Sequence, residues 1–173
     1  NAIFDRLRPD FAQQAKDRGL RFRMVASHLN VRSDPTLLEQ IVRNLISNAL
    51  KYTRHGKILL GCRRHGARLR IEVWDTGPGI PAGQLTAVFE EFHQLDNPAR
   101  ERARGLGLGL SIVQRLADLL GHRVDVRSRP NQGSVFSIEV PSIVAGTGDA
   151  PGTRRQQPPA HVTAGESILV IED

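Results

Sequence analysis

Two asparagines, a lysine and a tyrosine are spaced so that one side of a helix would carry them all. Asn44 and Asn48 are four residues apart, and Lys51 and Tyr52 follow within the next turn. A solvated helix face usually carries Lys and Glu, because these residues favour helices more than Asn does. Amide and ammonium groups on one stripe instead suit a polar ligand. We interpret this polar stripe as a candidate binding set in which Asn44, Asn48 and Lys51 are also the candidate catalytic residues, with an ordinary surface face as the alternative.

An aspartate ends the strand expected over Leu69–Asp75. Period two places Asp75 on the apolar face of this strand, where a carboxylate needs strong hydrogen bonds. A bound base with an exocyclic amino group would donate them. The turn that follows contains Gly77, Gly79 and Ile80, and its glycines would let the backbone approach a flat ligand. The alternative is a plain glycine turn with an exposed aspartate.

A second glycine cluster runs directly into a predicted helix. It consists of Gly105, Leu106, Gly107, Leu108, Gly109 and Leu110. Glycines before a helix N-terminus leave several N–H groups and the positive end of the helix dipole available to a phosphate. The cluster lacks the GK[ST] of a Walker loop and the strand and spacing of a dinucleotide fingerprint, and a flexible hinge is the alternative. Four arginines around it could neutralise phosphate charge, and the sequence does not single out one: Arg100, Arg102, Arg104 and Arg115.

Hydrophobic periodicity predicts the elements that must position these residues. Helices are expected over Asn1–Arg18, Asp34–Thr53 and Leu108–Leu120, with a short helical piece near Ala82–Phe92. Strands are expected over Leu20–Met24, Lys57–Arg63, Arg68–Asp75, Val124–Arg129 and Ser134–Val140. Because strands come in hairpins with helices between them, we expect an α/β fold. Its form would be a two-layer α/β sandwich with helices on one face of a mixed, mostly antiparallel sheet.

The composition divides the chain into three parts. Residues 1–141 carry the regular patterns of one domain. Residues 142–166 are rich in Gly, Pro, Thr, Ala and Gln without periodicity, which indicates a disordered linker. Residues 167–173 contain a short apolar strand that ends in Glu172 and Asp173. The pattern starts inside a helix and stops inside a strand, so we expect an excerpt of a longer protein.

Charge and composition exclude several classes of function. The 173 residues carry a formal charge of +6, with 21 arginines and three lysines. The arginines are scattered without aromatic interleaving, so we expect no nucleic-acid partner. The single cysteine, Cys62, excludes an internal disulfide and a cysteine metal cluster. No apolar run approaches a membrane span, and no signal peptide is visible. We expect a cytoplasmic domain without direct membrane contact, whether or not the parent protein is membrane-anchored.

Taken in order, these motifs resemble a known family. The asparagine helix, Asp75-x-Gly77-x-Gly79, Phe89-x-x-Phe92 and the second glycine cluster resemble the N, G1, F and G2 boxes of the catalytic and ATP-binding domain of a sensor histidine kinase. This domain type is part of the superfamily of gyrase, chaperone, histidine kinase and mismatch-repair ATP-binding domains. The resemblance covers roughly residues 1–140 and implies ATP and Mg²⁺ as cofactors.

The resemblance also implies a role for each motif residue. Asn48 would coordinate Mg²⁺ with Asn44 assisting, Lys51 would meet a phosphate, and Tyr52 would pack near the base. Asp75 would accept the adenine amino group. The pocket and its mobile lid would be lined by Gly77, Gly79, Ile80, Phe89, Phe92, Gly105, Leu106, Gly107, Leu108, Gly109 and Leu110.

One departure separates this chain from the related ATPases. They carry a water-activating glutamate one turn before the metal-binding asparagine, whereas this chain has Asn44, an amide that cannot act as a base. Glu39 lies one residue off the polar stripe. The sequence therefore favours transfer of the γ-phosphoryl group over hydrolysis. A related ATPase or serine kinase, and a degenerate nucleotide-binding module that only docks partners, remain the alternatives.

The expected phosphoryl acceptor is a histidine on a helical dimerisation domain of the same protein. None of the six histidines has the acceptor context of the family, so we expect this domain before Asn1 and expect no autophosphorylation by the fragment alone. The segment Ile168–Asp173 resembles the first strand of a receiver domain, as in a hybrid kinase of a two-component phosphorelay. We therefore expect a receiver downstream and a monomeric fragment.

Overall fold

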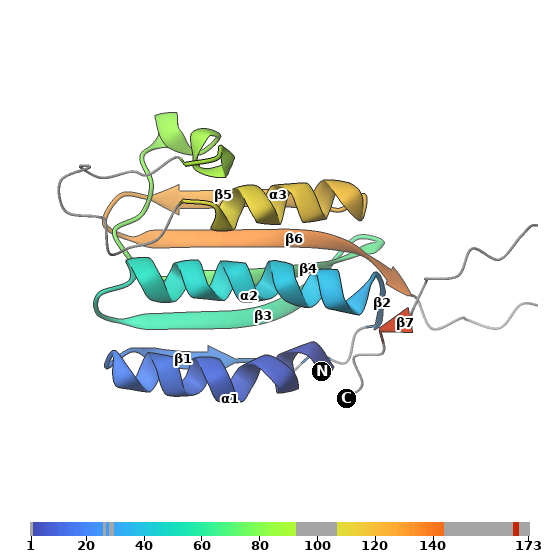
Figure 1. Cartoon of the computed structure of the whole chain (residues 1–173), viewed down its shortest axis with the longest axis horizontal. Coiled ribbons are helices and arrows are strands. Elements are labelled where there is room, and N and C mark those ends of the chain that lie inside the picture. The colour runs from blue at the N-terminus through green and yellow to red at the C-terminus, as the bar shows by residue number, and fades with distance from the viewer. Residues whose placement is uncertain (1, 26, 28–29, 93–106, 144–167, 170–173) are drawn as a thin grey trace, which may run out of the picture.

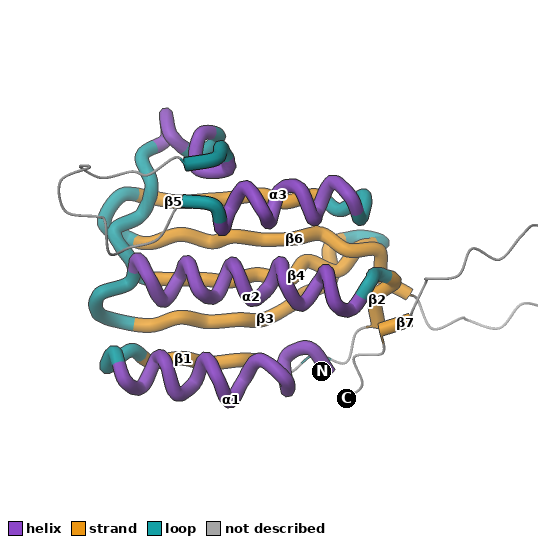
Figure 2. Tube along the Cα trace, viewed as in Figure 1, coloured by secondary structure: helices purple, strands orange, loops and turns teal. Residues whose placement is uncertain are grey.

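Three helices and a sheet form two layers. The computed structural model describes residues 2–25, 27, 30–92, 107–143 and 168–169. Helices α1 (Ala2–Asp17), α2 (Pro35–Tyr52) and α3 (Gly109–Leu119) lie side by side over one face of the sheet (Figures 1 and 2). The predicted two-layer α/β sandwich with helices on one face is confirmed.

The sheet has seven strands and is mixed. Its strands are β1 (Arg21–Met24), β2 (Asn30–Arg32), β3 (Lys57–His65), β4 (Arg68–Asp75), β5 (Arg123–Arg129), β6 (Gly133–Ile143) and β7 (Ile168–Leu169). The order is β1-β3-β4-β6-β2-β7, and β5 also pairs with β6. The β1–β3 pair is parallel, and the other pairs among the described strands are antiparallel. The mostly antiparallel sheet is as expected.

Three local features differ from the sequence prediction. Strand β2 was not predicted, because three residues are too short to show a period-two pattern. It pairs with the end of β6, so β6 continues past the predicted end at Val140 and includes Ser142 and Ile143. The helical piece near Ala82–Phe92 is two short 3-10 helices, η1 (Ala82–Gln84) and η2 (Ala87–Phe89), rather than one α-helix.

Helix α2 begins and ends at defined residues. The Asp34 side chain accepts hydrogen bonds from the backbone N–H groups of Thr36 and Leu37, each at 2.8 Å, and Pro35 occupies the first helical position. At the other end Thr53 has extended backbone angles and donates its N–H to the Ala49 carbonyl. These caps fix the register of the helix and therefore the direction of its polar stripe.

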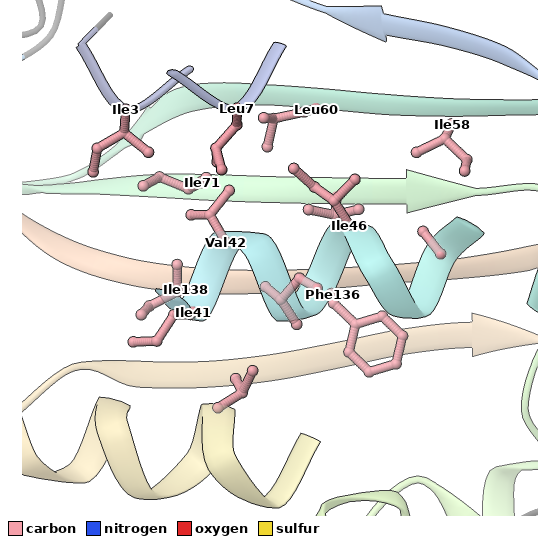
Figure 3. Close-up of a cluster of buried hydrophobic side chains, with 14 of the residues drawn as sticks. Ile3, Leu7, Ile41, Val42, Ile46, Ile58, Leu60, Ile71, Phe136 and Ile138 are labelled. Atoms are coloured by element: carbon pink, nitrogen blue, oxygen red, sulfur yellow. The ribbon is translucent and has the colours of Figure 1, made fainter. Parts of the chain in front are cut away.

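The core lies between the helices and the sheet and is mainly aliphatic (Figure 3). Leu45 and Ile46 of α2 are fully buried, as are Leu60 of β3 and Ile138 of β6. Burial of this kind stabilises by about 25 cal/mol per Å² of apolar surface. The apolar face of α2 thus holds the helix against the sheet, and its polar stripe is left toward α3.

Replacing Leu45 by alanine tests this packing. Leu45→Ala should lower the free energy of unfolding by about 2–5 kcal/mol, because the truncated side chain leaves a cavity that the core cannot fully close. The exposed Ser47→Ala on the same helix should change it by less than about 0.5 kcal/mol. Urea unfolding followed by circular dichroism measures both, and equal effects would contradict the assigned packing.

Candidate functional site

Several chain segments that are far apart in sequence meet at one end of the sandwich. The end of α2, the end of β4, the start of α3 and the β5–β6 turn lie at the same end of the molecule, beside η1 and η2 (Figure 1). The predicted polar stripe, the Asp75 turn and the described part of the second glycine cluster all belong to these segments. The structure therefore brings three of the predicted motifs to one region.

The asparagines of α2 contact the first residue of α3. A Cβ atom built on Gly109 would lie 3.3 Å from both Nδ2 and Oδ1 of Asn48 and 3.7 Å from Oδ1 of Asn44. Glycine therefore allows the start of α3 to approach the two amides closely. Asn44 also donates from Nδ2 to the Gln40 carbonyl at 2.9 Å, which directs its Oδ1 away from its own helix backbone. Two amide side chains thus face the N-terminus of a neighbouring helix.

That N-terminus leaves backbone donors available. Leu108 is the N-cap of α3 and no side chain caps the helix. Ser111 donates its hydroxyl to the Leu108 carbonyl at 2.9 Å, so it does not cap the N–H groups of the first turn. Leu110 packs against the hydrophobic core, and Gly107 has a positive φ. Gly105 and Leu106 of the predicted cluster lie outside the described residues.

Asp75 lies beside the end of α2. Its Oδ1 accepts a hydrogen bond from the Gly77 N–H at 2.8 Å. A Cβ on Gly77 would lie 3.3 Å from the Tyr52 carbonyl and 3.4 Å from Oγ1 of Thr53, so the turn after β4 packs tightly on the helix end. The Thr53 hydroxyl is buried without a hydrogen-bond partner among the described residues. A buried orphan hydroxyl beside a carboxylate suits a polar ligand.

Sequence reasoning missed Thr53. The available signal was its position, since a β-branched polar residue directly follows the last residue of the motif helix. Such a residue readily adopts the extended backbone that ends the helix. The same geometry places its hydroxyl inside the turn rather than in solvent.

The turn after Asp75 is pinned to the β5–β6 turn. Gly79 has φ +71°, and a Cβ there would lie 2.0 Å from the Arg129 carbonyl oxygen, so only glycine fits. The buried Ile80 donates its N–H to Oγ of Ser128 at 2.7 Å, and Asn131 donates its N–H to the Pro78 carbonyl at 2.6 Å. The turn is therefore fixed before any ligand arrives.

Burial raises the pKa of the Asp75 carboxyl above its ordinary value. Hydrogen bonds from the backbone N–H groups of Gly77 and Ser134 oppose this shift without cancelling it. Burial disfavours the ionised carboxylate, so ionisation of Asp75 lowers the stability of the folded protein. A ligand that donates a further hydrogen bond would offset that cost.

The remaining predicted contacts fall into different environments. The Lys51 ammonium lies 4.7 Å from the centre of the Tyr52 ring, at the end of α2. Phe89 packs edge to face against buried Phe136, with ring centres 6.3 Å apart. Phe92 has a positive φ and is 66% exposed. Phe89 thus lies half-buried against the core and Phe92 faces solvent, and their role as ligand contacts stays a prediction.

The nearest glutamate of α2 is engaged elsewhere. Glu39 forms ion pairs with Arg6 of α1 at 2.7 Å and with Arg43 at 3.4 Å. It therefore faces α1 rather than the α3 side, as its place off the polar stripe predicted. Of the four candidate phosphate-neutralising arginines, Arg115 pairs with Glu91. The other three, Arg100, Arg102 and Arg104, lie outside the described residues.

The described histidines have ordinary structural environments. His55 is exposed, and His65 pairs with Glu139 at 2.9 Å. His122 is buried against the Ser33 hydroxyl at 2.7 Å, and burial lowers its pKa. His28, His93 and His161 lie outside the described residues. The three described histidines therefore agree with the expectation of structural or solvent-exposed roles.

A family model matches the chain over the region that holds these motifs. Residues 33–143 match the model described as histidine kinase-, DNA gyrase B-, and HSP90-like ATPase. The chain belongs to this family. The match contains α2, the Asp75 turn and α3, so the ATPase family assignment and the site geometry concern the same residues. ATP is the ligand of this region.

Curated proteins similar to this chain include sensor histidine kinases. The chain is 35% identical to the sensor histidine kinase AtsR of Burkholderia thailandensis over 89% of this chain and 28% of that protein. It is 35% identical to the aerobic respiration control sensor protein ArcB of Escherichia coli, over 94% of this chain and 21% of ArcB. The chain thus spans about a quarter of the length of these relatives.

Solved structures agree with the fold. Full-length ShkA in complex with AMPPNP matches with a TM-score of 0.73 and 32% identity, over 84% of this chain and 30% of that one. The catalytic domain of the histidine kinase ThkA matches with a TM-score of 0.68 and 28% identity, over 82% of this chain and 91% of that one. Among the described residues, no helix is long and apolar enough to cross a membrane.

The raised pKa of Asp75 predicts a pH-dependent stability difference. Because the folded pKa lies above the unfolded one, the folded state binds the proton more tightly and loses stability as pH rises through the folded pKa. The amide introduced by Asp75→Asn does not ionise, so the variant does not lose this stability. The free energy of unfolding of Asp75→Asn minus that of the unsubstituted chain should therefore increase from acidic pH to pH 7. Urea unfolding without nucleotide at several pH values measures this, and a pH-independent difference would contradict it.

Proposed function

We propose that this chain is the ATP-binding catalytic domain of a hybrid sensor histidine kinase. It transfers the γ-phosphoryl group of ATP to a histidine on a separate helical dimerisation domain. The observation that carries this proposal is the approach of Gly109 at the start of α3 to the amides of Asn48 and Asn44. An uncapped helix N-terminus facing two amide oxygens suits a phosphate chain together with a hard cation.

In this proposal the adenine base of ATP lies at Asp75 and its phosphates lie at the start of α3. Asp75 accepts the adenine amino group, and the turn through Gly77, Gly79 and Ile80 lines the base. The orphan Thr53 hydroxyl gains its missing partner from the ligand side of this pocket. The first N–H groups of α3 hold phosphate oxygens, and Lys51 adds a positive charge.

The residues present also fit Mg²⁺. The described residues contain no cluster of three or more His, Cys, Asp or Glu side chains that could hold a metal by itself. An ion here would use the Oδ1 atom of Asn48, with Asn44 assisting, together with phosphate oxygens, and such oxygen ligands suit this cation. When bound, Mg²⁺ would neutralise charge on the transferring phosphoryl group.

The engaged Glu39 supports transfer rather than hydrolysis. Its carboxylate is held by Arg6 and Arg43, and the family position of the water-activating base is the amide Asn44. A positioned acceptor must therefore replace an activated water. Catalysis then consists of orienting the γ-phosphoryl group and excluding water, which suits a histidine nucleophile that needs little activation. A water-activating ATPase is correspondingly less well supported.

The proposed setting is a phosphorelay. We take the apolar segment at residues 167–173 as the start of a receiver domain, and the residues between the end of β6 and this segment as the linker. We propose a cytoplasmic location for the domain, because ATP is supplied there. A degenerate module that only docks partners is the alternative, and nucleotide titration separates the two.

Calorimetric titration with a non-hydrolysable ATP analogue tests nucleotide binding. The chain should bind the analogue, and binding should be stronger with Mg²⁺ than without it. Asp75→Asn should weaken binding by about tenfold or more, because an amide nitrogen replaces one of the acceptor oxygens. Asn48→Ala should remove most of the Mg²⁺ dependence. The matched surface variant Gln13→Ala on α1 should bind like the unsubstituted chain.

Transfer is tested by adding a dimerisation domain with its histidine in trans. Radiolabel from γ-labelled ATP should appear on that histidine, while phosphate release by the chain alone should stay at background. Nucleotide binding without any transfer to the histidine would contradict the kinase assignment and support the docking-module alternative. Rapid phosphate release by the chain alone would overturn the kinase assignment in favour of an ATPase.

A further inference from the structure

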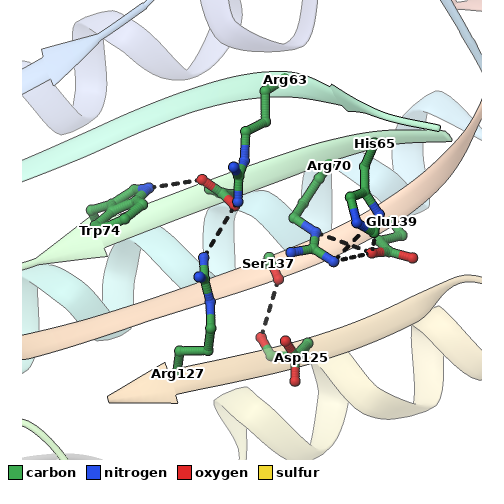
Figure 4. Close-up of polar contacts among 9 residues, drawn as sticks. Arg63, His65, Arg70, Trp74, Asp125, Arg127, Ser137 and Glu139 are labelled. Atoms are coloured by element: carbon green, nitrogen blue, oxygen red, sulfur yellow. Dashed lines mark hydrogen bonds and ion pairs between the residues drawn. The ribbon is translucent and has the colours of Figure 1, made fainter. Parts of the chain in front are cut away.

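The face of the sheet opposite the helices carries an ordered set of charged and aromatic side chains. Helices α1, α2 and α3 pack on the other face, and Figure 4 views the sheet with the helices behind it. Strand register places Leu59, Trp74 and Val135 in one row across β3, β4 and β6. The same row continues to Arg23 on β1 and Arg127 on β5. We call this row the Trp74 row.

The Trp74 row is apolar in the middle and cationic at both ends. Trp74 is 42% exposed, and Leu59 and Val135 are half-buried. Arg23 and Arg127 at the two ends are exposed. The three apolar side chains occupy adjacent positions, and a charged group flanks them at each end, which is the arrangement of a small apolar strip with a polar rim. The row has the composition of an interface core with a polar rim.

The Trp74 ring is held in place by charged neighbours. Its Nε1 donates to Oε2 of Glu72 at 3.0 Å, and the Arg127 guanidinium lies 5.9 Å from the ring centre. Glu72 is only 5% exposed and also receives two hydrogen bonds from Arg63, at 2.7 and 3.0 Å (Figure 4). With its N–H already bonded inside the protein, the indole presents hydrocarbon to the outside. A fixed ring loses little conformational entropy on binding.

The charge of this face is positive at its surface. The carboxylates of Glu72 and Glu139 are buried and already bonded to arginines, and Arg70 keeps the pKa of Glu139 below its ordinary value. Exposed arginines outnumber these two carboxylates and the half-buried Asp125 of the same face: Arg21, Arg23, Arg63, Arg123, Arg127 and Arg129. Among the described residues, Arg21, Arg23 and Arg129 have no ion-pair partner. Arg127 forms only a long ion pair with Glu72, at 3.5 Å, and about half of its side chain is exposed. Exposed guanidinium groups at the rim are suited to carboxylates.

We propose that the Trp74 row is a docking site for an acidic protein segment. Its partner presents a large apolar side chain to Trp74 and carboxylates to Arg23 and Arg127. The arrangement favours discrete carboxylates over a phosphate polymer or a lipid surface. The next row of the sheet, through Gly61, Glu72, Ser137 and Asp125, contains no arginine or lysine, so the face lacks the unbroken line of cations that a continuous polyanion would follow. Trp and Arg are also the residues that most often dominate protein interfaces.

Selection from a displayed library of random 16-residue peptides tests this proposal. Peptides are selected on the folded chain and counter-selected against Trp74→Ala. Enriched peptides should share a large apolar residue flanked by Asp or Glu. The absence of enrichment, or enrichment without acidic bias, would overturn the proposal.

A synthesised peptide from the selection allows a direct measurement. Trp74 is the only tryptophan of the chain, so its fluorescence reports binding at this row. The peptide should shift its emission, and Arg127→Gln should weaken binding by about tenfold. The matched control Arg8→Gln, which replaces an exposed arginine of α1, should leave binding unchanged. Circular dichroism checks that all variants fold.

Two further probes separate other partners. Vesicles of phosphatidylcholine with 30% phosphatidylserine and a 20-base-pair DNA duplex are titrated at about 150 mM salt, where screening weakens diffuse attraction. Neither should change Trp74 emission as much as the peptide does. Binding of either probe as tightly as the peptide, or equal peptide binding by Arg127→Gln and the unsubstituted chain, would overturn the proposal.

Discussion

The site depends on the direction in which α2 is held. Its apolar face, with Leu45 and Ile46 fully buried, fixes the helix against the sheet. The polar stripe on the other side of the helix can therefore point in only one direction. The start of α3 then meets Asn48 and Asn44 so closely that a Cβ on Gly109 would lie only 3.3 Å from the Asn48 amide and 3.7 Å from that of Asn44. A small rotation of α2 would move both amides away from the N–H groups of α3. Core packing and ligand geometry are therefore one constraint, and the binding site is as rigid as the helix layer that carries it.

The two faces of the sheet serve different purposes. The inner face carries Asp75 of the proposed ATP site, whose pKa is raised by burial and whose following turn only glycine can make at position 79. The outer face holds Trp74 outward with the carboxylate of Glu72. Because Asp75 and Trp74 are adjacent on β4, period two sends one side chain to each face. A partner on the outer face would thus contact the strand that ends at the base pocket, without occupying the pocket.

Sequence patterns predicted the long elements and the main motif positions. The N-cap Asp34 and the alternation before Asp75 are local signals, and the corresponding elements formed as expected. Strand β2 gave no such signal, since its three residues become a strand only by pairing with β6 and β7. Thr53 was missed for a related reason: its buried, unpaired hydroxyl follows from packing between α2 and the Asp75 turn. The separation of Phe89, packed in the core, from exposed Phe92 was equally invisible to spacing.

The central claim is that α2, the Asp75 turn and the start of α3 form one ATP site. The most direct test is heteronuclear NMR of the labelled chain titrated with AMPPNP and Mg²⁺. The account predicts shift changes at the side-chain amides of Asn44 and Asn48 and at the backbone amides of Gly77 and Gly109, while the Trp74 indole resonance stays in place. Shifts confined to other regions, or saturation by nucleotide without change at Asn48 and Gly109, would contradict it.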